Sequence, residues 1–290
     1  MGVHDIPSET MNPSIAQELA AAIDRMPAFP KSVQRILELA REDTSTAKEL
    51  VTVIDRDPVL TLKMLKVVNS AYFRLPRQIN SVGHAVVFLG FNATRNLALG
   101  MAAIGMLPTG RSAGFDWQDC LLHSVATAMI ARQLAARVPD ADPMECFVAG
   151  LLHDFGKIVM ARSMPERLQE ALETARRDGS SLHLVMQQQW GTDHAAVGAL
   201  LVERWRFPAP LVETIRNQFG PALPDTGMIA CVFAANQVCK KLQFGSAGNP
   251  FVSELPPAIA QRLGGSLDEV IASLGDLEPV LDQSRLLASA

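Results

Sequence analysis

The stretch DPVLTLKMLKVVNSAYF, residues 57–73, carries the pattern on which the predicted fold rests. Its apolar residues recur at the spacing of one helical face, at Leu60, Met64, Val67 and Val68. Lys63 and Lys66 fall off that stripe and can stay in water. Asp57 is placed to cap a first turn that begins with proline, and Asn69 is expected to end the helix by bonding free carbonyls, in a backbone conformation that can be left-handed. The stretch therefore predicts a capped helix that packs on a core, with no nucleophile paired to a base.

Other helix starts along the chain are chemically explicit. Thr46 with Glu49 fits a capping box, in which a side-chain oxygen satisfies a free backbone N–H group of the first turn. Asp142 precedes a proline as Asp57 does, and two further pairs have the capping-box spacing, Ser163 with Glu166 and Ser266 with Glu269. Strand signals are few, and Gly and Pro fall mainly between periodic segments. The sequence thus predicts an all-α fold, with helices near 14–25, 31–41, 46–55, 58–69, 81–88, 91–105, 116–137, 142–155, 165–178, 182–190, 194–205, 208–217, 225–243, 256–262 and 266–274.

The composition is that of a compact globular protein, and it predicts neither nucleic acid nor a membrane as a binding partner. Apolar residues make up 48% and charged residues 19% of 290 residues, and the net charge of -4 gives no electrostatic reason to expect a nucleic-acid partner. No apolar run approaches the roughly 20 residues that span a bilayer, and the first residues lack the pattern of a signal peptide. The four cysteines have no CxxC spacing and are interpreted as small buried thiols. A cytoplasmic protein is expected.

Three blocks in the first hundred residues resemble the opening of an HDOD domain. They are MPAFPKSVQRILELA, ELVTVIDRDPVLTLKMLKVVNSAYF and INSVGHAVVFLGFNATRNLALG, which follow one another in the order typical of that family over residues 26–100. The segment 187–215, with His194, Gly198, Trp205 and Pro208, is similar to HDOD proteins as well. The resemblance implies a multi-helix fold in which an N-terminal helical subdomain packs on a helical bundle like that of the HD superfamily. It also implies a role in bacterial signal transduction, as a stand-alone HDOD protein.

The expected organisation follows from composition and from this resemblance. The segment MLPTGRSAGFD, residues 106–116, is rich in Gly and small polar residues and marks the main internal boundary, and 244–250 marks a weaker one. We expect four regions: a flexible tail over 1–13, an N-terminal helical part of the HDOD domain over 14–110, an HD-like helical part over 111–245 and a C-terminal helical extension over 246–290.

One cluster of residue types suggests a metal site. His153 and Asp154 lie in the otherwise apolar stretch VAGLLHDFGKIVM, and His123 lies on a helix that is apolar or small nearly all round. Buried imidazole and carboxylate groups are costly unless they share a metal, a proton or a hydrogen-bond network. Two His and one Asp suit one divalent transition metal such as Mn, Fe or Zn, which could activate water. No cofactor is assigned, and a hydrogen-bonded remnant of a metal site stays open beside a bound ion.

The same trio resembles the HD superfamily of metal-dependent phosphohydrolases, in which a later aspartate completes the ion's ligands. By similarity this chain has Asn236 at that point, and no acidic residue occurs between 226 and 253. Catalytic HD-GYP proteins carry histidines where Gln218 and Phe219 are expected to align. The resemblance therefore implies a degenerate site, with His123, His153 and Asp154 as vestigial or weak ligands. No catalytic residue is assigned, although Lys157 could help in acid–base chemistry or only pair with Asp154.

Two hypotheses follow for function. The first is a non-catalytic regulatory or scaffold module that passes a signal through contacts with other signalling proteins. The alternative is a single-metal phosphohydrolase that acts on a nucleotide or cyclic dinucleotide. His194 at a helix start is interpreted as a packed or capping residue, with a ligand role left open, and Gly198 as a point of close helix packing. His183 and His84 are interpreted as ordinary residues. The sequence predicts neither the partner nor the oligomeric state.

Overall fold

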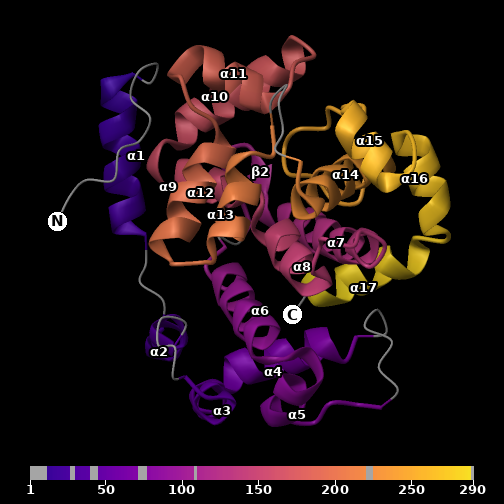
Figure 1. The fold of residues 1–290 in the computed structure, drawn as a ribbon. Helices are drawn as coiled ribbons and strands as arrows, with labels where there is room; N and C mark the ends of the chain where they lie inside the picture. Colours follow the sequence, from indigo (N-terminus) through magenta and orange to yellow (C-terminus); the bar gives the residue numbers. More distant parts are fainter. Residues whose placement is uncertain are drawn as a thin grey trace.

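The computed structural model describes residues 12–26, 30–39, 45–70, 77–107, 110–219 and 225–288. Regular structure in these ranges is helical apart from one two-stranded hairpin, so the all-α prediction is confirmed (Figure 1). The elements are α1 (Pro13–Arg25), α2 (Lys31–Leu39), α3 (Ala47–Asp55), α4 (Pro58–Val68), α5 (Val82–Leu89), α6 (Phe91–Ile104), β1 (Arg111–Ser112), β2 (Phe115–Asp116), α7 (Trp117–Ala135), α8 (Pro143–Leu152), α9 (Phe155–Ser163), α10 (Pro165–Arg177), α11 (Leu182–Trp190), α12 (His194–Arg204), α13 (Ala209–Arg216), α14 (Gly227–Leu242), α15 (Pro257–Leu263), α16 (Leu267–Leu274) and α17 (Glu278–Ala288).

Some predicted features lie outside the described residues. These are most of the tail expected over 1–13, the last two residues of the helix expected over 31–41, and the Ala-x-Phe end of the stretch 57–73. The four-region organisation expected from the sequence stays a prediction.

Helix α7 is the centre of the molecule. It packs against α8, α14 and α17, and its side chains are buried on nearly every side. Small residues make this possible, since Ala126, Ala128 and Ala131 are fully buried and let neighbouring helices approach closely. His123 lies in the same buried stretch, as its apolar surroundings predicted.

The remaining helices are arranged in groups around α7. Helices α2 to α5 form one end of the molecule, and α6 runs from that group to α8 (Figure 1). Helix α1 packs on α9 and α12, at a distance from α2 in the view of Figure 1. Helices α14 to α17 cover another side of the bundle.

The helix starts read from the sequence are mostly confirmed. Asp57 accepts a hydrogen bond from the backbone of Leu60, and capping boxes are present at Thr46 with Glu49 and at Ser266. The capping box expected at Ser163 is wrong, because its hydroxyl donates to the carbonyl of Val159 in the preceding helix, α9. Helix α10 instead begins after Met164 at a proline, without a side-chain cap.

The end of α4 differs from the expectation. Asn69 has an ordinary backbone conformation, with φ of -85°, and its side chain does not bond helix carbonyls. Its amide instead donates to the carbonyl of Ile79 at 2.7 Å and accepts from the N–H group of Ile79 at 2.7 Å. The residue therefore ties the end of α4 to the chain that leads into α5.

Two helices were missed and one was drawn too long. The helix expected over 142–155 ends at Leu152, and α9 begins at Phe155, so the break falls on His153 and Asp154. Helix α17 was also missed, although Ser284 and Leu281 are buried and the helix packs on α7. The start of α9 carries no side-chain cap, so no separate start signal marks this helix in the sequence.

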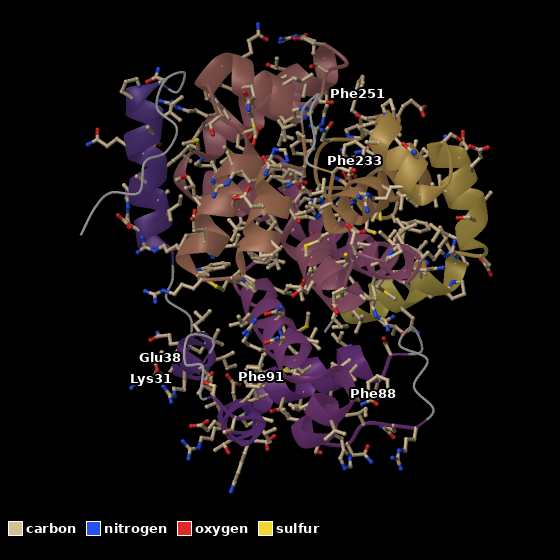
Figure 2. All side chains as sticks on the ribbon, viewed as in Figure 1. Lys31, Glu38, Phe88, Phe91, Phe233 and Phe251 are labelled. Atoms are coloured by element: carbon tan, nitrogen blue, oxygen red, sulfur yellow. The ribbon has the colours of Figure 1, made fainter. Side chains whose placement is uncertain are left out.

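Other expectations from composition are confirmed. All four cysteines are buried free thiols. Among the helices of the described ranges, none combines the length and the apolar character that a membrane span requires. Figure 2 shows Phe233 on α14, where it is 7% exposed, and Phe88 on α5, where it is half exposed.

Candidate metal centre

Three predicted ligands meet at one buried point. His123 comes from α7, and His153 and Asp154 come from the break between α8 and α9. One ligand atom of each residue lies within 4.8 Å of those of the other two. All three side chains are at most 4% exposed. The structure thus brings together the residues that the sequence singled out, from positions thirty residues apart.

The imidazole of His153 is held in one orientation. Its Nδ1 lies 2.7 Å from the carbonyl oxygen of Gly150, so Nδ1 carries a proton and donates it there. Its other nitrogen, Nε2, lies 3.2 Å from Oδ2 of Asp154. Because Nδ1 is committed to the carbonyl oxygen, Nε2 is the ring nitrogen that faces the carboxylate, on the side where a metal could be bound.

His123 faces the side-chain amide of Asn236. Its Nε2 lies 3.2 Å from Oδ1 of Asn236 on α14, and 4.0 Å from Oδ2 of Asp154. Burial, followed by the neighbouring His153, lowers the pKa of His123 to about 3, so this ring is neutral. Whichever way the amide is turned, the Nε2 of His123 either donates its proton to the oxygen or accepts one from the nitrogen. In both cases Asn236 engages the nitrogen that would bind a metal.

Asp154 is paired with a buried lysine. Nζ of Lys157 lies 2.8 Å from Oδ1 of Asp154 and donates to the carbonyl of Ala247 at 3.0 Å. Lys157 follows Asp154 by three residues and so lies on the same face of α9. Burial raises the pKa of Asp154, but His153 and Lys157 outweigh it and hold that pKa well below its usual range. The carboxylate is therefore charged and partly neutralised by an ammonium group.

His194 belongs to this site more closely than the sequence suggested. It is the first residue of α12, it is 1% exposed, and its Nε2 lies 3.4 Å from Oδ1 of Asp154. Asp193 caps the helix through the N–H group of Ala196, so His194 has no capping role. Burial, followed by the charge of Lys157, lowers the pKa of His194. From the sequence alone, a histidine at a helix start cannot be distinguished from one that is only packed in the core.

The residues expected at the histidine positions of active enzymes form a wall of the site. Gln218 donates through Nε2 to the carbonyl of His153 at 2.7 Å. Phe219 stacks on His183, with ring centroids 4.3 Å apart, and meets His194 edge-on at 5.0 Å. These side chains hold the site's backbone and rings and present no further ligand. His183, interpreted as ordinary, thus supports the ring packing behind His194.

Glycines allow α12 to lie close enough for His194 to reach the site. A Cβ atom on Gly156 would lie 1.8 Å from the carbonyl oxygen of His194 and 2.7 Å from the N of Gly198. Gly198 faces Gly156 in return, which confirms the close packing predicted for it. Gly245 has φ of +68°, and a Cβ atom there would lie 2.4 Å from the backbone nitrogen of His123. Backbone contact on two sides therefore fixes the positions of the imidazoles.

A cavity of about 530 Å³ opens beside His123, with Lys240 and Gly245 on its walls. Burial, followed by repulsion from Lys157, lowers the pKa of Lys240 to about 8. This cavity therefore brings small molecules to His123 past Lys240, which is cationic at neutral pH.

The donor set fits one divalent transition metal in chemical type. Two imidazoles and one carboxylate, each neutral or anionic, are ligands that Zn, Mn and Fe accept in proteins. The Nε2 atom of His153 has no hydrogen-bond partner within the described part of the chain, as a vacant ligand nitrogen would. Asn236 and Lys157 oppose occupation, since one engages His123 and the other places a positive charge beside Asp154. The group of His123, His153 and Asp154 could hold one metal ion.

Comparison with known proteins agrees with this architecture. The model of the HDOD domain family matches residues 26–221. That range holds His123, His153, Asp154 and Gln218, whereas Asn236 on α14 lies beyond it. An uncharacterised protein of Treponema pallidum (strain Nichols) is 27% identical over 242 residues, which are 82% of this chain and 47% of that protein. The chain thus spans about half the length of the curated relative it matches.

Solved structures share the fold over nearly the whole chain. A proposed phosphohydrolase from Shewanella amazonensis SB2B is 25% identical, with a TM-score of 0.71 over 93% of this chain and 98% of that one. An HDOD domain protein of unknown function from Geobacter sulfurreducens is 24% identical, with a TM-score of 0.72 over 95% and 96% of the two chains. A proposed signal transduction protein from Marinobacter aquaeolei VT8 is 22% identical, with a TM-score of 0.71 over 97% of this chain and 67% of that one.

Proposed function

Since the chain belongs to the HDOD domain family, and since protein groups already engage two of the three candidate ligand residues, His123 and Asp154, we propose that it is a non-catalytic regulatory module of bacterial signal transduction. In this proposal the protein is cytoplasmic, and its helical surface transmits a signal by contact with other signalling proteins. The cluster of His123, His153 and Asp154 then serves mainly as a buried polar network that fixes the packing of α7, α8 and α9.

One observation carries the proposal: Asn236, at the point where the resemblance to the HD superfamily implies an acid, has its side chain 3.2 Å from the Nε2 of His123. An amide is a poor ligand for a transition metal, and it adds no negative charge. The ammonium of Lys157, 2.8 Å from Asp154, supplies the positive charge that the buried carboxylate needs. The negative charge of Asp154 is thus balanced by Lys157, without a metal ion.

The outer surface supports a role in protein contacts. Large apolar side chains are exposed on two packed helices, α4 and α5, with Leu62 at 69% and Val87 at 87% exposure. Val59 at 65% and Phe88 at 50% add to the same end of the molecule (Figure 2). Large apolar side chains exposed on neighbouring helices favour contact with another protein.

A second candidate function is a single-metal phosphohydrolase. It is favoured by the 4.8 Å clustering of the three ligand atoms and by the likeness to the proposed phosphohydrolase from Shewanella amazonensis. In that case His123, His153 and Asp154 would hold the ion, which would supply an activated water. Lys157 and Lys240 would attract an anionic substrate to the cavity beside His123.

Metal analysis and an activity screen separate the two functions. The protein is purified without chelator, its Mn, Fe and Zn contents are measured, and hydrolysis is assayed on nucleotides, cyclic dinucleotides and a generic phosphodiester. The variant His153→Ala removes a ligand, and His84→Ala removes an exposed histidine on α5 as the matched control.

The regulatory proposal predicts less than stoichiometric metal and no turnover in the native protein and in both variants. Stoichiometric metal together with phosphoester hydrolysis, both lost in His153→Ala and kept in His84→Ala, would establish the phosphohydrolase and overturn the proposal.

A further inference from the structure

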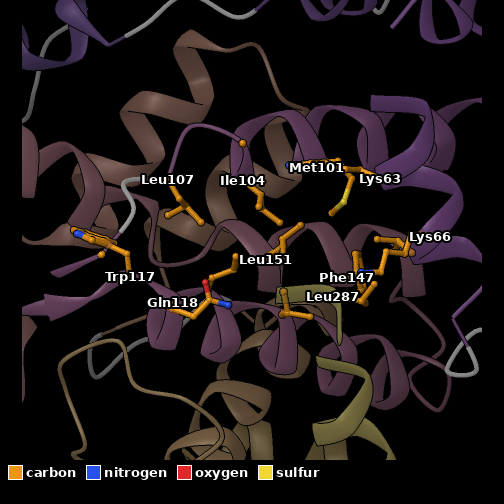
Figure 3. Close-up of a pocket in the computed structure, with 15 residues that line it drawn as sticks. Lys63, Lys66, Met101, Ile104, Leu107, Trp117, Gln118, Phe147, Leu151 and Leu287 are labelled. Carbon is orange, nitrogen blue, oxygen red and sulfur yellow. The ribbon is translucent and has the colours of Figure 1, made fainter. Parts of the chain in front are cut away.

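A cavity of about 240 Å³ lies between three parts of the chain, and none of the candidate metal ligands lines it (Figure 3). Its walls come from α4 and α6 on one side, from α7 and α8 on the other, and from Leu287 of α17. Protein interiors rarely leave a void much larger than a water molecule, so a space of this size at a junction of helices is a candidate for a ligand.

Between Trp117 and Lys63 the cavity is lined mainly by apolar side chains. The amide of Gln118, which also lines it, donates to the carbonyl of Ala288 at 2.8 Å. Figure 3 shows Met101, Ile104 and Leu107 in a row that faces Leu151, with Trp117 at one end. Trp117 is 1% exposed, and its indole N–H group is already used by Ser112 at 2.7 Å, so it offers this space an apolar surface. The walls therefore favour a hydrocarbon body.

The opposite end carries two lysines. Lys63 and Lys66 stand one helical turn apart on α4 and reach the same end of the cavity (Figure 3). Lys66 donates to the carbonyl of Leu286 at 2.8 Å, which leaves two of its three N–H donors, and Lys63 has no bonded partner in the described part of the chain. Neither lysine has an ion pair there, so both can receive an anionic group.

From this arrangement we propose that the cavity binds a small anionic amphiphile: a short hydrocarbon chain that ends in a carboxylate or phosphate group. The chain lies between α6 and α8 and extends toward Trp117, and the anionic head lies between Lys63 and Lys66. The volume equals that of roughly eight molecules of liquid water, which suits a chain of roughly six to ten carbon atoms. Charge-assisted hydrogen bonds from two ammonium groups select the anion.

A ligand bound at this site would be a signal that the regulatory module senses, and the proposed function does not specify such a signal. A bound ligand would contact α4, α7 and α17 together, and so would favour one packing of these helices over others. The inference stands on the cavity alone, and it holds whether or not the metal centre is catalytic.

Binding of four probes with the same chain length tests the proposal. Octanoate, octyl phosphate, 1-octanol and octylammonium are titrated into the full chain by calorimetry, and the methyl signals of Met101 and Ile104 are followed by NMR. We expect octanoate or octyl phosphate to bind about tenfold more tightly than octanol, and octylammonium to bind least, because charged hydrogen bonds exceed neutral ones. The two anions distinguish a carboxylate ligand from a phosphate ligand.

Three variants locate the site. Lys63→Met with Lys66→Met removes both charges and should bring the affinity for the anion down to that for octanol. Leu107→Trp fills the cavity from a partly exposed position and should weaken every probe by at least about tenfold. Lys48→Met removes an exposed lysine on α3 and should change nothing. Circular dichroism and urea unfolding confirm that each variant is folded.

Absence of saturable binding to the native chain would overturn the proposal. So would equal affinity for octanoate, octanol and octylammonium, or full binding of an anion by a folded Leu107→Trp variant.

Discussion

The ammonium nitrogen of Lys157 lies 2.8 Å from Oδ1 of Asp154, and the two side chains are 3% and 4% exposed. A buried carboxylate that loses its partner charge is strongly destabilised, whereas removal of both charges costs much less. Lys157 therefore provides the positive charge that keeps the buried carboxylate of Asp154 stable.

Lys157→Met should lower the free energy of unfolding by about 3–5 kcal/mol, since Asp154 would be left buried without its cation. The double variant with Asp154→Asn should recover a large part of that loss. Urea unfolding at pH 7.5 measures both, and Lys48→Met on the surface serves as the control. Mn²⁺ should raise the melting temperature of Lys157→Met more than that of the native protein, because the ion can then take the place of the ammonium group. A single variant within about 0.5 kcal/mol of the native protein would contradict the assignment.

Asn236→Asp should restore the charge that the candidate metal centre lacks. The carboxylate adds one negative charge 3.2 Å from the Nε2 of His123, at the place where the amide now engages that nitrogen. We expect Mn²⁺ and Zn²⁺ to bind at least about tenfold more tightly, since a hard anionic ligand replaces a neutral one. Calorimetry on metal-free protein gives the affinities.

The matched control for this change is Asn92→Asp, an exposed position at the start of α6 that adds the same charge far from the centre. Equal metal affinity in Asn236→Asp and the native protein would show that Asn236 is not what limits metal binding.

Gly156→Ala should destabilise the fold through the contact between α9 and α12. The new Cβ atom would lie 1.8 Å from the carbonyl oxygen of His194, and no flexible side chain can move aside there because the neighbour is backbone. We expect a loss of about 3 kcal/mol or more in the free energy of unfolding. Gly83→Ala is the control, since its Cβ atom would meet nothing closer than 3.9 Å, and it should be neutral or slightly stabilising. Similar unfolding midpoints for the two variants would refute the close-packing argument.

Local chemistry explains which parts of the fold could be predicted. Helix starts that place a capping side chain next to proline, such as Asp57 and Asp142, act within a few residues and were correct. The side chain of Asn69 could have bonded helix carbonyls, and it bonds Ile79 instead, ten residues away. Such a choice between local and distant partners depends on tertiary packing, which the order of residues does not display.

The site shows the same division. His123, His153 and Asp154 were identified because an imidazole or a carboxylate in an apolar stretch needs a partner. His194 is interpreted from the sequence as a packed or capping residue, with a ligand role left open, and it is the close contact of Gly156 and Gly198 that lets it lie 3.4 Å from Asp154. The distance between His194 and Asp154 depends on how closely α9 and α12 pack. The spacing of residues within either helix could therefore not predict it.

His183 should make the stability of the protein depend on pH between about 6.5 and 4. Burial, followed by the nearby His194, lowers the pKa of His183 from 6.5 to about 4 in the folded protein. As the pH falls through that range, His183 takes up a proton in the unfolded chain but stays neutral in the folded protein. The free energy of unfolding therefore falls. The ring is partly exposed and screened by solvent, and we expect a loss of no more than about 1–2 kcal/mol by pH 5.

Urea unfolding at pH 7.5 and pH 5 measures this loss in the native protein and in His183→Phe, which keeps a ring stacked on Phe219 but cannot bind a proton. The variant should lose less stability between the two pH values than the native protein does. His84→Phe, at an exposed position on α5, should leave the native pH dependence unchanged. An NMR titration of the His183 ring gives an independent reading, with a midpoint expected near 4. A midpoint near 6.5, or a pH dependence in His183→Phe equal to that of the native protein, would show that burial behind Phe219 does not control the proton on this ring.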